Sequence, residues 1–68
     1  MTVSQAEQLL ARIAKEADEG DDETAHAAED DLRTKVLRAI AAGRTDDPAG
    51  LAAVALRSAD IRFSRWCA

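Results

Sequence analysis

Apolar side chains recur at every third or fourth position near the start of the chain. These residues are Ala6, Leu9, Leu10, Ile13 and Ala17. This spacing places them on one side of an α-helix. Ser4 and Glu7 match a capping box, in which each side chain accepts a hydrogen bond from the backbone amide of the other residue. We therefore predict a helix over residues 5–18, which Gly20 ends.

A longer apolar stripe follows the acidic turn at 18–23. It consists of Ala25, Ala28, Leu32, Val36, Ala39 and Ile40. These residues share one face of a predicted helix over 22–42, and Gly43 supplies its C-terminal stop. Leu37 lies about 120° around this helix from Ala25, away from the stripe. It therefore needs a neighbour outside the predicted core.

A shorter helix is predicted over residues 48–57, because Asp47 is a suitable N-cap and Pro48 suits the first helical position. Its inner face carries Leu51, Val54 and Ala55. The final segment, 58–68, holds three large apolar residues, Ile61, Phe63 and Trp66. We expect this segment to form a packed, irregular tail. An extended segment and a helical turn capped by Asp60 are the alternatives.

These elements predict an all-α fold in a single domain over 1–68, with three helices and a packed aromatic C-terminal tail. A short connection makes the first two helices an antiparallel hairpin, and the third helix folds over its open side. The core is thin, because sixteen of the hydrophobic residues are alanine and only fifteen are large. A thin core in so short a chain favours self-association or a partner.

Charge is divided unevenly along the chain. Residues 1–31 contain ten acidic and two basic residues (−8), whereas residues 32–68 contain seven basic and three acidic residues (+4), which gives the net charge of −4. The two halves can pair within one molecule or between molecules, or bind different partners. An antiparallel dimer would bring the acidic and basic ends together.

Residue types that carry catalysis are scarce. His26 has no companion ligand in the sequence, and the penultimate Cys67 has no neighbour that would lower its pKa. The acidic turn at 18–23 lacks the spacing of a calcium loop, and no glycine-rich phosphate loop is present. We therefore predict no enzyme activity, no cofactor and no metal site, with His26 as a solvated surface residue.

The composition also indicates in which cellular compartment the protein is found. A single cysteine forms no internal disulfide, which favours an intracellular protein. No segment has the length and apolar character of a membrane span, and the N-terminus does not resemble a signal peptide. We expect a cytoplasmic protein that does not enter a membrane.

Exposed apolar and arginine side chains are the candidate partner-binding residues, because aromatic residues and arginine dominate protein interfaces. They are Leu37, Leu56, Arg57, Arg62, Arg65 and Trp66. The alternative for Phe63 and Trp66 is that they complete the thin core, with the arginines around its rim. This second interpretation is favoured for the two aromatic residues.

Part of the chain, residues 47–66, resembles the helix-turn-helix sequences of small repressors. The residues that carry this likeness are Leu51-Ala52, Ser58 and Phe63-Ser64-Arg65-Trp66. The resemblance implies a recognition helix over 58–66 in the DNA major groove, with Arg57, Arg62 and Arg65 contacting phosphates or guanines. The acidic first half of the chain opposes DNA, so a DNA-binding regulator is the alternative function and nucleic acid is a disfavoured partner.

The whole chain is similar in composition to small acidic proteins of actinobacterial phages and their hosts. The likeness rests on Glu29-Asp30-Asp31-Leu32-Arg33, on residues 36–43 and on residues 63–68. It implies a protein without enzymatic motifs that binds one host or phage protein. We therefore expect a non-enzymatic protein-binding accessory factor, a phage-encoded modulator in the host cytoplasm, that also forms a homodimer.

Overall fold

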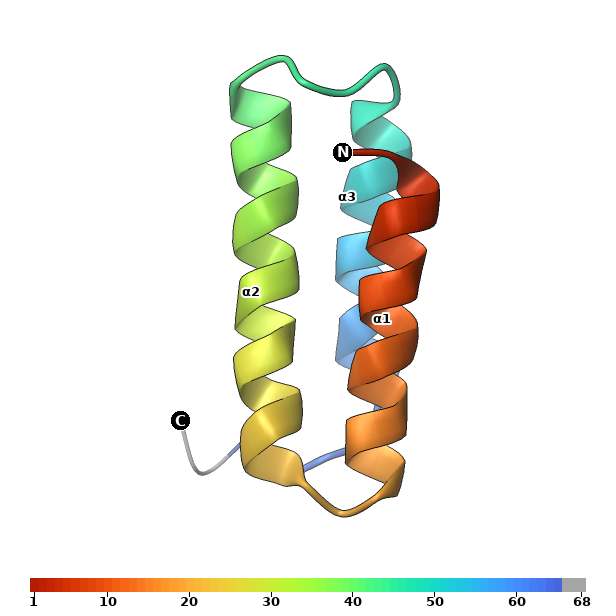
Figure 1. The fold of residues 1–68 in the computed structure, drawn as a ribbon, viewed down its shortest axis with the longest axis vertical. Coiled ribbons are helices and arrows are strands. Elements are labelled where there is room, and N and C mark those ends of the chain that lie inside the picture. Colours follow the sequence, from red (N-terminus) through yellow and green to blue (C-terminus); the bar gives the residue numbers. More distant parts are fainter. Residues whose placement is uncertain (66–68) are drawn as a thin grey trace.

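A computed structural model describes residues 1–65 of the chain. It contains α1 (Val3–Asp18), α2 (Asp22–Ala41), α3 (Pro48–Arg57) and a short 3-10 helix, η1 (Ser58–Asp60), and residues 1–65 form no strand. This confirms the all-helical, three-helix prediction. The helices lie along the long axis of a molecule measuring 35 × 19 × 14 Å, and the chain reverses direction at each of the two connections between them (Figure 1).

The start of α1 differs from the prediction. Thr2 is the N-cap: its hydroxyl accepts from the Gln5 amide at 3.1 Å, and the Gln5 side chain accepts from the Thr2 amide at 2.9 Å. The capping box predicted at Ser4 and Glu7 is therefore wrong by two residues. The earlier start adds Val3 to the helix, where it packs against the core.

The other helix ends lie within one residue of the positions predicted from their capping residues. Asp21 and Asp47 cap α2 and α3, and the Asp47 carboxylate accepts from the Gly50 amide at 2.9 Å. Gly20 and Gly43, which end the first two helices, have φ of +79° and +66°, the left-handed region that suits glycine. Helix α3 has the predicted bounds, and α2 ends one residue before the predicted position.

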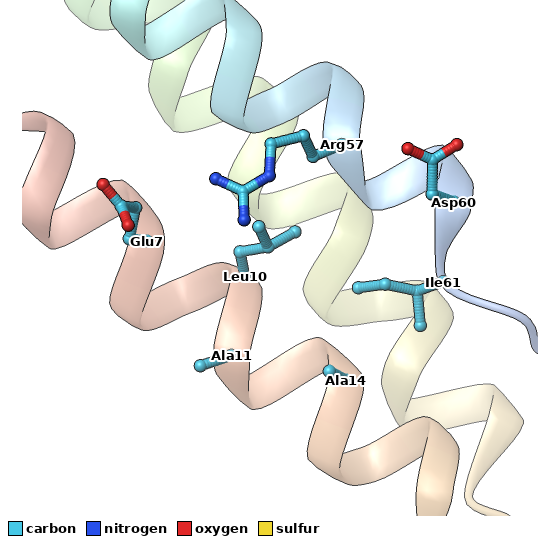
Figure 2. A pocket seen from close by; sticks show the side chains of 7 residues that line it. All are labelled: Glu7, Leu10, Ala11, Ala14, Arg57, Asp60 and Ile61. Atoms are coloured by element: carbon cyan, nitrogen blue, oxygen red, sulfur yellow. The ribbon is translucent and has the colours of Figure 1, made fainter.

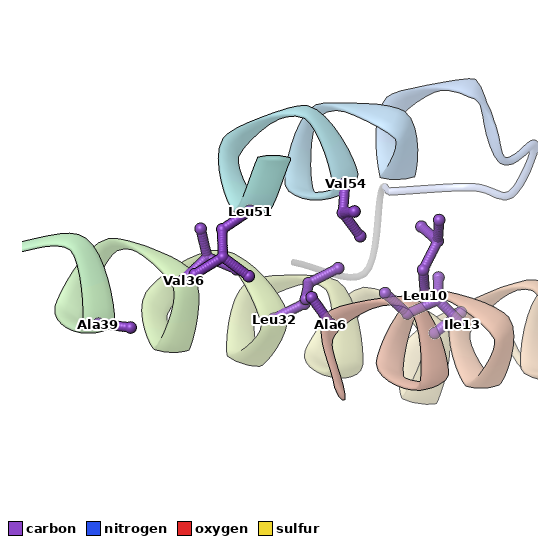
Figure 3. Close-up of a cluster of buried hydrophobic side chains, with 9 residues drawn as sticks. Ala6, Leu10, Ile13, Leu32, Val36, Ala39, Leu51 and Val54 are labelled. Carbon is purple, nitrogen blue, oxygen red and sulfur yellow. The ribbon is translucent and has the colours of Figure 1, made fainter. Parts of the chain in front are cut away.

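Nine buried apolar side chains from all three helices form the core (Figure 3). They are Ala6, Leu10, Ile13, Ala25, Leu32, Val36, Ala39, Leu51 and Val54. Helices α1 and α2 pack extensively against each other, and α3 packs on both. Leu9, Ala17, Ala28, Ile40 and Ala55, which were also predicted on the inner faces, are partly buried at the edge of this core. Small and medium side chains dominate the core, as the composition indicated.

The segment after α3 is short and irregular. Following the 3-10 turn, Ile61 has an extended backbone (φ −78°, ψ 125°), and Ile61 and Phe63 are partly buried against the core. The recognition helix implied from residue 58 onward is therefore wrong for residues 61–65. Trp66 and Cys67 lie outside the described residues, so the position of Trp66 stays a prediction.

Replacing Leu32 with Asp should unfold the domain. Leu32 is fully buried in the middle of α2, and an unpartnered buried carboxylate costs more than the roughly 3–5 kcal/mol that a core of this size supplies. Helical circular dichroism and a cooperative thermal melt should both be lost. Thr34→Asp, on the exposed side of the same helix, is the control and should keep both. A wild-type melt for Leu32→Asp would contradict the assigned core.

Candidate protein-binding surface

Two leucines remain exposed on neighbouring helices. Leu37 on α2 is 66% exposed and Leu56 on α3 is 72% exposed. Both line a groove of about 390 Å³ between these helices. Its lining consists of Arg33, Val36, Leu37, Ala52, Ala55 and Leu56. Single exposed leucines are common on protein surfaces, but two that share one apolar groove indicate a surface suited to contact with another molecule.

The sequence creates this groove in two ways. Leu37 follows the buried Val36 and points about 100° away from it, so it lies outside the core-facing stripe as predicted. The facing positions on α3 are Ala52 and Ala55, whose side chains end at Cβ and leave the space between the helices unfilled. The exposed leucines therefore border a hollow.

A buried carboxylate lies near this groove. Glu29 is 2% exposed, among the apolar side chains of α2. Arg65 binds it in a bidentate manner: Nε donates to Oε1 at 3.0 Å and Nη2 donates to Oε2 at 2.9 Å. Arg33 Nη2 lies 3.6 Å from the same Oε2. The Arg65 hydrogen bonds lower the pKa of Glu29 and outweigh burial, which acts to raise it.

Arg65 also organises the segment after α3. Its Nη2 donates to the carbonyls of Ser58 at 3.2 Å and Ile61 at 3.3 Å, and its Nη1 donates to that of Phe63 at 3.4 Å. The guanidinium carbon lies 3.9 Å from the centroid of the Phe63 ring, a cation–π contact. A single side chain therefore ties this segment to itself and to the middle of α2.

Ser58 completes the link between α2 and the end of α3. It is fully buried, its hydroxyl donates to the Ala55 carbonyl at 2.9 Å, and it accepts from Arg33 Nη2 at 3.1 Å. Arg33 thus lines the groove and also holds Ser58 beside Glu29. The groove and the buried ion pair share this arginine.

A second cavity, of about 460 Å³, lies between α1 and the end of α3 (Figure 2). Arg57 lines this cavity, and its side chain lies between Glu7 on α1 and Asp60. Among residues 1–65 no ion pair within 4.0 Å involves Arg57. The cavity brings opposite charges near each other, but its lining includes no histidine, cysteine or hydroxyl group that could act as a nucleophile.

The six predicted partner-binding residues do not form one surface. Leu37 and Leu56 share the groove, Arg57 lines the second cavity, and Arg62 is exposed. Arg65 directs its guanidinium inward, to Glu29 and to carbonyl groups of its own segment. Trp66 falls outside the described range. The structure thus brings together the two leucines and separates the arginines.

His26 is more enclosed than predicted. Its side chain is 19% exposed, and Nδ1 lies 3.7 Å from an Asp30 oxygen one turn later on α2. Within residues 1–65 no three His, Cys, Asp or Glu side chains are grouped so that they could hold a metal ion. His26 is thus a half-buried helix residue beside one carboxylate.

Sequence reasoning missed the roles of Glu29, Arg33 and Ser58. A signal for Glu29 was present: it continues the 4–3 spacing of the buried residues on α2, which occupy positions 25, 29, 32, 36 and 39. A charged residue in such a stripe needs a buried partner. No local signal identified Arg65 as that partner, because it lies 36 positions later.

Comparisons with protein-family models, with curated proteins and with solved structures give no match. No helix in residues 1–65 has both the length and the apolar character needed to span a membrane.

Loss of the Arg65 side chain should destabilise the fold. Arg65→Ala leaves the Glu29 carboxylate buried without its bidentate partner, which should lower the free energy of unfolding by about 2–3 kcal/mol. Arg62→Ala, an exposed neighbour on the same segment, is the matched control and should change it by less than about 0.5 kcal/mol. Urea denaturation followed by circular dichroism measures both. Equal stabilities for the two variants would show that the ion pair does not hold the segment.

Acid should weaken the protein through Glu29. Its pKa in the folded state lies below the ordinary value of 4.5, so the folded state binds fewer protons than the unfolded chain. The stability that this group contributes is present above pH 4.5 and is lost as the pH falls through the folded-state pKa. Glu29→Gln should therefore show a shallower loss of unfolding free energy on acidification. Identical pH slopes for Glu29→Gln and wild type in urea titrations would exclude this linkage.

Proposed function

We propose that this protein is a non-enzymatic accessory factor that binds a protein through the groove between α2 and α3. The observation that supports this proposal is the pair of exposed leucines, Leu37 and Leu56, on the two borders of one apolar groove. In this proposal α1 and α2 form an antiparallel hairpin, and α3 packs against it. Helix α2 then forms one border of the groove and α3 forms the other. The mechanism is binding by shape and apolar contact.

The groove fits an α-helix better than an extended strand. It lies between two helices, and no strand in residues 1–65 offers a free edge for strand addition. An amphipathic helix that places apolar side chains three or four positions apart can occupy such a groove. Ala52 and Ala55 permit close approach of its backbone, and Leu37 and Leu56 supply the apolar contacts on either side.

A host protein is the class of partner that the phage-like composition favours. An acidic phage-encoded protein of this size can alter a host protein by covering a helix on its surface. Arg33, whose side chain is 44% exposed at the groove, would suit an acidic residue at the edge of that helix. The proposal therefore specifies an apolar helix with a flanking carboxylate.

DNA binding is the alternative, and the geometry supports it less well. Residue 61 is extended where the recognition helix would continue, and Arg65 is engaged by Glu29. Arg57 and Arg62 remain exposed, but the net charge of −4 opposes approach to a phosphate backbone. These observations favour a protein partner.

Affinity capture from the native host, paired with a gel-shift assay, tests the proposal. Wild-type protein should recover one dominant protein, and Leu37→Glu and Leu56→Glu should each lower its recovery at least about tenfold, since charge enters an apolar contact. Ala11→Glu, which adds the same charge on α1 at the second cavity, is the control and should bind as wild type. All three variants should keep a cooperative melt.

Two outcomes would contradict the proposed function. Capture that survives both leucine substitutions would place the binding site elsewhere. Specific duplex binding at nanomolar concentration, with a steep dependence on salt that Arg57→Ala and Arg62→Ala together reduce by about two units of slope, would establish the DNA-binding alternative.

A further inference from the structure

We infer that a pocket at the C-terminal end of α2 binds a diphosphate group. The pocket has a volume of about 290 Å³, and its lining consists of Met1, Lys35, Arg38, Ala39 and Arg44. Three of these five residues are basic, in a protein whose net charge is −4. The lining of this pocket shares no residue with the groove between α2 and α3, so the inference does not depend on the proposed function.

The turn after α2 holds the backbone of Arg44 against the lining of the pocket. Gly43 has φ of +66°, its amide donates to the Ile40 carbonyl at 3.1 Å, and the Arg44 amide donates to the Ala39 carbonyl at 2.9 Å. These two bonds form a Schellman motif. The Arg44 carbonyl accepts from the Met1 amino group at 2.9 Å. Both polar groups of the Arg44 backbone are therefore bound, and the fold sets where this residue lies relative to Ala39 and Met1.

Two of the three bases in the pocket have no ionic partner. Among residues 1–65 no ion pair within 4.0 Å involves Arg38 or Arg44. Lys35 Nζ lies 2.9 Å from Asp31 Oδ2, but these side chains are 51% and 55% exposed, and exposed pairs of this kind contribute little. Three positive charges therefore line one small pocket, and an anion bound there would reduce their mutual repulsion.

The dipole of α2 accounts for only one of these bases. A cation in the last turn of a helix is stabilised by the helix dipole, and Arg38 lies in the last turn of α2. This effect falls off within one turn, whereas Lys35 lies a turn earlier and Arg44 lies beyond the helix. The stretch 32–44 contains four bases and no acid, and the nearest acids along the chain on its two sides are Asp31 and Asp46. The position of the three bases is thus explained better by an anion than by the helix end.

A diphosphate is the anion that these residues suit. The guanidinium groups of Arg38 and Arg44 can each donate two parallel hydrogen bonds to phosphate oxygens, and Lys35 adds a compact charge. The volume lies at the lower end of the range for ligand pockets, so the pocket fits a small, highly charged group. A long polyanion fits less well, because the ten acids of residues 1–31 would repel it. Free pyrophosphate and a nucleoside diphosphate are two sources of this group.

Titration calorimetry of the full chain with sodium pyrophosphate, at constant ionic strength, tests the inference. Wild type should bind one equivalent with a submillimolar dissociation constant, and its melting temperature should rise with pyrophosphate concentration because the folded state alone binds it. Arg38→Gln and Arg44→Gln should each weaken binding about tenfold, since each removes hydrogen bonds from a charged donor. Arg62→Gln, at an exposed arginine on the segment after α3, is the matched control and should bind as wild type.

A parallel titration with a nucleoside diphosphate distinguishes the two sources. Binding tighter than that of pyrophosphate, and weakened by Arg38→Gln, would support a nucleotide as the ligand, whereas weaker binding would support free pyrophosphate. Absence of saturable pyrophosphate binding at millimolar concentration would overturn the inference. Binding that Arg62→Gln weakens as much as Arg38→Gln and Arg44→Gln do would also overturn it, because it would reflect net charge alone. Each variant should melt cooperatively without pyrophosphate, which excludes unfolding as the cause of lost binding.

Discussion

The ion pair between Glu29 and Arg65 is the constraint on which the remaining structure depends. A carboxylate in the buried stripe of α2 is tolerable only with a cation and hydrogen-bond donors at hand. The bidentate geometry meets this need, at 2.9 and 3.0 Å. The same guanidinium holds three carbonyls of the segment after α3, so Ile61 and Phe63 are positioned over the core by the group that neutralises Glu29.

The buried ion pair also adjoins the apolar groove on the surface, because Arg33 contacts Glu29 and lines the groove. Arg33, Ser58 and Glu29 form a cluster between α2 and the end of α3, and the groove beside it is lined on α3 by Ala52, Ala55 and Leu56. Leucine at 37 and 56 then has no larger side chain to pack against. The two exposed leucines therefore lie beside the buried polar cluster. The polar cluster and the apolar groove are therefore neighbours on the same two helices, with Arg33 in both.

Local signals in the sequence accounted for the helices but not for their polar connections. The bounds of α3 were predictable because Asp47 and Pro48 act within one turn. The predicted start of α1, at Ser4 and Glu7, was wrong because Thr2 and Gln5 form the capping box two residues earlier. A distant contact also holds this end of the chain: the Met1 amino group donates to the Arg44 carbonyl at 2.9 Å. The exposed position of Leu37 followed from helical geometry, but the groove required knowledge of where α3 lies.

The buried pair has a consequence for how this sequence can evolve. Apolar replacements of a whole buried ion pair are often neutral or stabilising, whereas loss of one partner is strongly unfavourable. Positions 29 and 65 are therefore expected to change together rather than one at a time. A lineage that exchanged both for apolar residues would free the segment after α3 to diverge in length and sequence, while the three helices would keep their arrangement.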